Sequence, residues 1–166
     1  MHSGLRTRAV LGIALPMLSF LAAAPQAGAQ WAAPPASSAY SIPSAQLMQP
    51  AELNRLLHDA KAPKPLILQV GSRVMYDQAH IPGSEYAGPG SRDEGLGLLR
   101  ARVNTLARDR FIVLYCGCCP WDRCPNVGPA YKLLRDMGFT QVKVLYIAGN
   151  FGADWVSQGY AVAPAQ

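Results

Sequence analysis

Short apolar runs alternate along the chain with longer stretches in which apolar residues recur at helical spacing. Short runs of this kind are typical of strands that are buried on both faces of a sheet. We predict strands at residues 66–70, 110–115 and 142–146, and a brief one at 85–86. Helices are predicted at residues 50–60, 73–78, 96–106, 127–137 and 151–158. Because strands and helices alternate, we expect a parallel sheet with helices on both faces.

The first 29 residues have the composition of a secretory signal peptide. Arg6 and Arg8 form a basic start, an apolar stretch covers residues 9–24, and residues 27–29 are a small-residue cleavage site. A retained membrane anchor is the alternative, but Pro16 interrupts the apolar stretch, which is shorter than the ~20 residues that span a bilayer. We therefore expect export, either to a bacterial periplasm or out of the cell.

The rest of the chain predicts a short lead-in followed by a single domain. Residues 30–45 are rich in Ala, Pro and Ser and predict a flexible segment, and residues 46–162 predict the folded domain. Cleavage after Ala29 removes two arginines and lowers the formal net charge from +5 to +3. The remaining positive residues are scattered, and no nucleic-acid-binding module is visible. The expected partners are therefore small anions, with no nucleic acid and no membrane after signal cleavage, whereas the oligomeric state does not follow from the sequence.

All the cysteines of the chain lie in one short segment. Cys116, Cys118, Cys119 and Cys124 fall within nine residues, between a predicted strand and a predicted helix. Open α/β sheets place their active sites at this end of a strand. In an oxidising compartment the cysteines could instead form structural disulfides. Because such short loops remove little chain entropy when they are closed, we favour a chemical role.

Three motifs resemble the rhodanese-like (sulfurtransferase) domain family. They are the turn at residues 80–84 (His-Ile-Pro-Gly-Ser), the strand end at 114–116 (Leu-Tyr-Cys) and the helix start at 49–53 (Gln-Pro-Ala-Glu-Leu). The likeness extends over residues 46–162 and implies a three-layer α/β fold with a mostly parallel, five-stranded sheet. It also implies a loop cysteine that carries a persulfide. Sulfane sulfur would pass from a thiosulfate-like donor to a thiol or cyanide-like acceptor, with no cofactor.

Three features depart from the family pattern. Gln69 and Gly71 stand where the family usually has Asp and Arg, on either side of a valine in the second strand. The active-site loop is longer than usual, and it contains extra cysteines. These differences leave the substrate open. His80, in the turn motif, is predicted to be a hydrogen-bonded structural residue rather than a catalytic one.

Cys116 has the position of the family's nucleophile, directly after the strand, and is our prediction for the catalytic cysteine. Cys118 and Cys119 are the alternates, and Cys118 stands in a Cys-x4-Arg spacing with Arg123. Converging backbone N–H groups and a helix N-terminus lower the pKa of a cysteine, so we expect a thiolate in this loop. Asn126 is predicted to cap the helix that follows.

Further residues of the loop are predicted to assist the nucleophile. Arg123, Gly117 and Trp121 are the predicted substrate-binding residues, and a solvated surface position is the alternative for Arg123. A nearby thiol resolves a persulfide or sulfenic acid as a disulfide. The predicted redox or resolving thiols are Cys118, Cys119 and Cys124.

Other functions are open at this point. Thiolate-rich sites hold Cu(I) or Zn(II), although zinc prefers paired Cys-x2-Cys segments. A periplasmic thiol–disulfide oxidoreductase is weakened because the surroundings of the cysteines are not thioredoxin-like. A Cys-x5-Arg phosphatase site does not match the spacing, and an inactive rhodanese-like scaffold is a further alternative. The ligands of a metal site would be Cys116, Cys118, Cys119 and Cys124.

Overall fold

The structure is a computed structural model that describes residues 42–163 of the chain. The predicted signal peptide and most of the predicted lead-in lie outside the described residues. Within residues 42–163, no helix combines the length and the apolar character needed to cross a bilayer.

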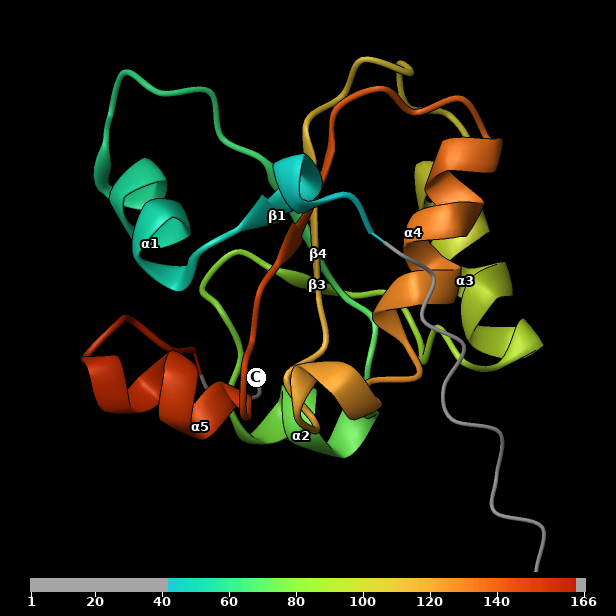
Figure 1. Ribbon diagram of the computed structural model, residues 1–166. Helices are drawn as coiled ribbons and strands as arrows, with labels where there is room; N and C mark the ends of the chain where they lie inside the picture. The colour runs from blue at the N-terminus through green and yellow to red at the C-terminus, as the bar shows by residue number, and fades with distance from the viewer. Residues whose placement is uncertain (1–41, 164–166) are drawn as a thin grey trace, which may run out of the picture. The chain divides into compact units, whose positions relative to one another are not determined.

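The described part of the chain contains one parallel sheet of five strands in the order β1-β5-β4-β2-β3 (Figure 1). This arrangement confirms the predicted fold class. Two neighbouring interior strands, Leu66–Gln69 and Ile112–Tyr115, are buried at every position, as their apolar runs predicted, and Gln69 is the one polar amide among their side chains. The strands are β1 (Leu47–Met48), β2 (Leu66–Gln69), β3 (Glu85–Tyr86), β4 (Ile112–Tyr115) and β5 (Val142–Leu145).

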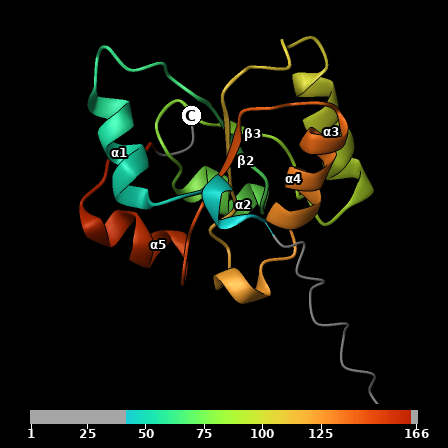
Figure 2. The same cartoon turned by 45° about the horizontal axis from the view of Figure 1, so that its top comes forward.

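Helices cover both faces of this sheet. In both views α1 and α5 lie on one side of the strands and α3 and α4 lie on the other (Figures 1 and 2). The helices are α1 (Pro50–His58), α2 (Arg73–Gln78), α3 (Asp93–Val103), α4 (Val127–Asp136) and α5 (Phe151–Asp154). Three short 3-10 turns, η1 (Ser44–Gln46), η2 (Trp121–Arg123) and η3 (Val156–Gln158), complete the elements.

The structure corrects two of the predicted helices and adds one strand. No strand was predicted at β1, because two residues are too few for a hydrophobic pattern, and β1 forms by pairing Leu47 with Val144 of β5. The helix predicted at residues 96–106 begins at Asp93, whose carboxylate suits the positive end of a helix, and ends at Val103. The helix predicted at 151–158 divides at Trp155, which leaves the helical conformation and buries its ring.

Alternation along β4 divides the apolar core between the two faces of the sheet. Ile112 and Leu114 pack with residues of α3 and α4, whereas Val113 and Tyr115 pack with residues of α1 and α5. Because side chains alternate along a strand, the next residue, Cys116, points to the α3/α4 side. Its side chain is 4% exposed and belongs to that cluster.

His80 has the structural role that its turn motif predicted. Its Nδ1 atom lies 2.9 Å from the carbonyl oxygen of Tyr76, and the two rings stack with centroids 4.0 Å apart. Its backbone exchanges hydrogen bonds with Ala163 near the end of the described chain.

Candidate active site

The cysteine loop, residues 116–126, runs from the C-terminal end of β4 to the start of α4. The segment that follows β5 holds it in place. The backbone N–H of Phe151 donates to the carbonyl of Gly117 over 3.0 Å, and the N–H of Trp121 donates to the carbonyl of Ala148 over 3.0 Å. The Trp121 ring also packs on Tyr146, with centroids 5.0 Å apart. The long loop is therefore supported at the edge of the sheet where α/β folds carry their sites.

Gly117 allows this close approach between the loop and α5. Its φ of +75° lies in the left-handed region, and a Cβ atom at this position would lie 2.7 Å from the Cβ of Phe151. Of the predicted substrate-binding residues, Gly117 is buried, Trp121 is half-buried against Tyr146, and Arg123 is exposed in η2. The contacts of Gly117 and Trp121 hold the loop in its conformation, and the predicted binding roles of all three residues stay predictions.

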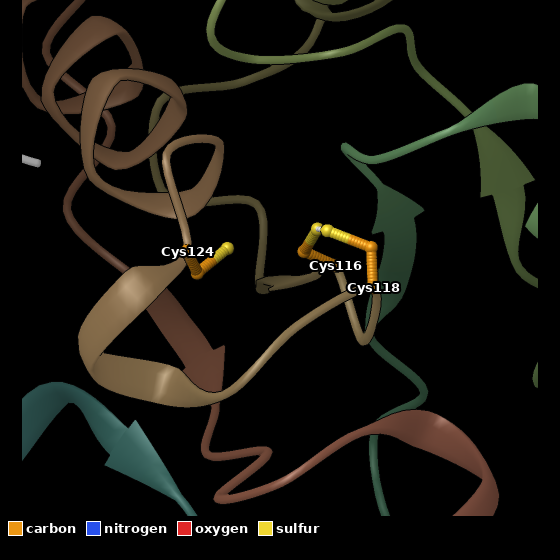
Figure 3. A group of neighbouring side chains, drawn as sticks. All are labelled: Cys116, Cys118 and Cys124. Atoms are coloured by element: carbon orange, nitrogen blue, oxygen red, sulfur yellow. Dashed lines mark hydrogen bonds between the residues drawn. The ribbon is translucent and has the colours of Figure 1, made fainter. Parts of the chain in front are cut away.

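All four thiols are free, and Figure 3 shows three of them, Cys116, Cys118 and Cys124. Cys118 lies between Cys116 and Cys119. Its sulfur is 3.0 Å from that of Cys116 and 3.2 Å from that of Cys119. The sulfur atoms of Cys116, Cys118 and Cys124 all lie within 4.8 Å of one another. Cys119 is outside this group of three, and its thiol donates to the carbonyl of Arg123 over 3.6 Å.

Asn126 occupies the N-cap position of α4, as predicted, but its side chain binds the sulfur atoms instead of the first turn of the helix. Its Nδ2 group donates to the sulfur of Cys116 over 3.3 Å and to that of Cys118 over 3.7 Å. Its Oδ1 atom accepts from the backbone N–H of Ser91 over 3.0 Å, and no cap hydrogen bond forms. The buried carboxamide is therefore fixed with its donor end toward the thiols.

These contacts make the four thiols electrostatically unequal. The hydrogen bond from Cys116, followed by that from Cys124, holds the pKa of Cys118 far below its ordinary value, although burial opposes the shift. The same interaction raises the pKa of Cys116, whose proton is shared toward Cys118. Burial raises the pKa of Cys119. Cys118 is therefore the thiol of the cluster that ionises most readily.

The pKa of Cys124, at the start of α4, is shifted in opposite directions by its neighbours. Its hydrogen bond with Cys116 lowers its pKa, as do the backbone N–H groups of Asn126 and Val127. The hydrogen bond to Cys118 and burial raise it, and the net result is a raised pKa. The backbone N–H groups at the start of the helix therefore lower the pKa of Cys124, as expected of a helix N-terminus. The pKa of Cys118 is lowered instead by thiol and carboxamide donors.

Gln69 and Gly71, the two residues at the end of β2 that depart from the family pattern, contact Cys116. The buried Gln69 side chain accepts from the N–H of Gly71 over 3.1 Å and donates to the carbonyl of Cys116 over 3.4 Å. A Cβ atom on Gly71 would lie 2.8 Å from the sulfur of Cys116. Gly71, which has no side chain, thus leaves room for the sulfur of Cys116, and the neutral amide of Gln69 holds the backbone of Cys116.

A cleft of about 360 Å³ opens beside Cys118, the one cysteine among its lining residues. Arg73 and Arg92 both line it, from the segments that follow β2 and β3. Arg73 is paired with Asp77 over 2.8 Å, and its guanidinium lies 5.2 Å from the ring centroid of Tyr86. Arg123, the predicted anion-binding residue, does not line this cleft.

Sequence reasoning did not identify the two arginines or Asn126 as parts of the site. The order of the strands was the missing signal, because β2 and β3 end at the same edge of the parallel sheet as β4. Polar residues just after those strands, such as Arg73 and Arg92, were therefore candidates for the site once the strands were assigned.

Comparison with known proteins supports this reading of the fold. Residues 49–149 match the family model of the rhodanese-like domain, and the chain belongs to that family. The solution structure of the rhodanese-like domain of an Anabaena protein is 24% identical, with a TM-score of 0.53, and the match covers 72% of this chain and 79% of that one. A crystal structure of the same Anabaena protein is 24% identical with a TM-score of 0.54, covering 71% and 92% of the two chains.

A crystal structure of a Bacillus halodurans protein is also similar, at 20% identity and a TM-score of 0.54, with coverage of 70% of this chain and 75% of that one. At these identities the likeness concerns the fold. No match was found among curated proteins. The family includes sulfurtransferases as well as inactive members, so membership by itself does not establish the activity.

Proposed function

We propose that this protein is a sulfurtransferase that carries sulfane sulfur as a persulfide on Cys118. The observation that carries the proposal is the position of Cys118. Its sulfur is the acceptor for surrounding thiol and carboxamide donors, and it is the cysteine that lines the cleft. A thiolate that is both stabilised and accessible is what nucleophilic sulfur chemistry requires.

In the first step, the Cys118 thiolate attacks the outer sulfur of a thiosulfate-like donor. A bond forms between the two sulfur atoms, the S–S bond of the donor breaks, and sulfite leaves with the electron pair. In the second step, an acceptor thiolate or cyanide attacks the outer sulfur of the persulfide. The S–S bond between the outer sulfur and Cys118 breaks, and its electron pair returns to Cys118 as thiolate. No proton, oxidant or reductant is consumed.

The surroundings of Cys118 fit an anionic donor. Arg73 and Arg92 line the cleft and raise the local concentration of anions. Asn126 donates toward the sulfur and supports negative charge on it in both the thiolate and the persulfide. Cys116 is almost fully buried, so an external donor reaches it less readily than Cys118.

A redox function is the second candidate, and the 3.0 Å separation of the Cys116 and Cys118 sulfur atoms favours it. In this scheme the Cys116 thiol attacks the inner sulfur of a Cys118 persulfide. A disulfide forms between the two cysteines, and the outer sulfur leaves as hydrosulfide with the electron pair. An external dithiol must then reduce the disulfide before another cycle.

The experiment is intact-mass measurement of the reduced protein after treatment with thiosulfate. We expect the gain of one sulfur atom in the wild type, loss of the adduct in Cys118→Ser, and its retention in Cys119→Ser as the matched control. An adduct that persists in Cys118→Ser but disappears in Cys116→Ser assigns the nucleophile to the position favoured by the family resemblance. A wild type that never takes up sulfur contradicts the proposed activity, and a protein lighter than the reduced form by two hydrogen atoms, with release of hydrosulfide, supports the redox candidate.

A further inference from the structure

Three thiols converge from the two ends of the cysteine loop. Cys116 and Cys118 come from the end of β4, and Cys124 points toward them from the start of α4 (Figure 3). Their sulfur atoms lie within 4.8 Å of one another, and those of Cys116 and Cys118 are 3.0 Å apart. The loop that carries them is held at both ends by the sheet and the helix.

We propose that these three sulfur atoms bind one Cu(I) ion in trigonal coordination. With metal–sulfur bonds of about 2.3 Å, three sulfur atoms around one ion lie about 4 Å apart. The separations in this group, between 3.0 and 4.8 Å, bracket that value. Binding therefore needs sulfur movements of about 1 Å or less, which thiol rotation and small loop adjustments supply.

The ligand set distinguishes Cu(I) from Zn(II). Structural zinc sites require four protein ligands in a tetrahedron. Among residues 42–163, no His, Asp or Glu joins the group of three cysteines. The fourth thiol, Cys119, lies outside the group and donates to the carbonyl of Arg123. Thiolate ligands suit both Cu(I) and Zn(II). A set of three matches the low coordination number of Cu(I) and leaves a structural zinc site one ligand short.

The surroundings also suit a thiolate complex that carries excess negative charge. Asn126 donates to the sulfur atoms of Cys116 and Cys118 while its own oxygen is held by Ser91. Hydrogen bonds of this kind orient metal ligands and stabilise their charge. The buried Cys116 shields one side of the ion from water.

Binding is a ligand exchange without electron transfer. Copper enters as Cu(I) and remains so, Cu–S bonds replace S–H bonds, and the displaced protons pass to solvent. Because Cys118 becomes a ligand, a bound copper ion blocks uptake of sulfur at that atom. The copper site does not depend on the proposed sulfur transfer, and each proposal can fail without the other.

The test uses the reduced, purified protein under anaerobic conditions, titrated with Cu(I) in competition with a chromogenic Cu(I) chelator. We expect one Cu(I) per chain, and the X-ray absorption spectrum of this complex should show three sulfur neighbours. Replacing Cys124 by Ser removes one ligand and should weaken Cu(I) binding by more than about 10-fold. Cys119→Ser is the matched control and should bind within about twofold of the wild type.

Several results would overturn the copper site. They are failure of the wild type to retain Cu(I) against the chelator, two or four sulfur neighbours in the spectrum, and an equal loss of affinity in Cys119→Ser and Cys124→Ser. Because the spectrum is measured on the wild type, misfolding of a variant does not affect that part of the test. Sulfur uptake from thiosulfate is measured on the copper-free wild type, so failure of the copper site is distinguishable from failure of the sulfurtransferase.

Discussion

Cys118 is surrounded by donors, whereas Cys116 is buried beneath it and Cys119 donates to a backbone carbonyl. The side chains are chemically identical, so the difference in their behaviour comes from their neighbours. A thiolate on Cys118 accepts hydrogen bonds from Cys116 and from Asn126. This charge then disfavours ionisation of the surrounding thiols. Reactivity at the site therefore depends on the arrangement of the thiols rather than on their number.

The lowered pKa of Cys118 predicts an unusual pH profile for alkylation. An ordinary thiol, with a pKa of about 8.5, loses reactivity about tenfold per pH unit below that value because only the thiolate reacts. Cys118 stays ionised as the pH falls through this range, so iodoacetamide should label it at a nearly constant rate between about pH 6 and pH 8. The other three thiols, with raised pKa values, should stay unlabelled at the acid end. Peptide mapping after timed alkylation measures both effects.

Asn126→Ala tests the physical cause of this profile. Removing the carboxamide donor should raise the pKa of Cys118 and restore part of the dependence on pH. A wild-type rate that climbs tenfold with each pH unit, or labelling that begins at Cys116, contradicts the assignment of the charge to Cys118.

Among the structural elements, the cysteine loop depends on its contact with α5. The carbonyl of Gly117 accepts from Phe151, and the backbone at Gly117 is left-handed. An alanine in this position meets both a disfavoured φ and a contact of 2.7 Å with the Cβ of Phe151. The loop or α5 must move to relieve that contact, and the sulfur atoms of Cys116 and Cys118 move with the loop.

We therefore predict that Gly117→Ala lowers the free energy of unfolding by about 1–3 kcal/mol, measured by urea denaturation. Gly97→Ala is the matched control, since Gly97 is an exposed residue of α3 with open space around its Cβ position. In a helix interior, alanine is favoured over glycine by about 1 kcal/mol, so this control should be neutral or stabilising. Equal denaturation midpoints for the two variants would show that the loop tolerates a side chain at Gly117.

In the described domain as a whole, β4 joins the apolar core to the cysteine loop. Its residues pack into the apolar clusters on both faces of the sheet, and Cys116 extends the cluster on the α3/α4 side. The thiols thus rest directly on close-packed side chains. A void beneath Cys116 should change both the stability of the domain and the positions of the sulfur atoms.

Leu114→Ala creates such a void, because Leu114 is fully buried in the cluster that contains Cys116. We expect a loss of about 2–5 kcal/mol in the free energy of unfolding, which thermal or chemical denaturation measures. Leu98→Ala, at a side chain that is 50% exposed, is the control and should change stability by no more than about 0.5 kcal/mol. If the two variants lose the same stability, the core does not have the arrangement described here.

The architecture followed from the amino-acid pattern to a large extent. Buried strands and amphipathic helices are periodic over a few residues, so β2, β4, β5 and α4 were identified close to their observed bounds. The family motifs added the five-stranded sheet, and the position of the cysteines after β4 placed them at the functional edge of the fold. The strand β1 was missed because its two residues form a strand only when they pair with β5.

The arrangement of the site, by contrast, depends on contacts between residues far apart in the chain. Gly71 makes room for Cys116, Ser91 orients Asn126, and Arg73 and Arg92 reach the cleft beside Cys118. Hydrophobic periodicity reports burial but not the separations of a few ångströms that set hydrogen bonds and thiol pKa values. The fold class was therefore readable from local pattern and motif, whereas the central position of Cys118 became visible only when the chain was folded.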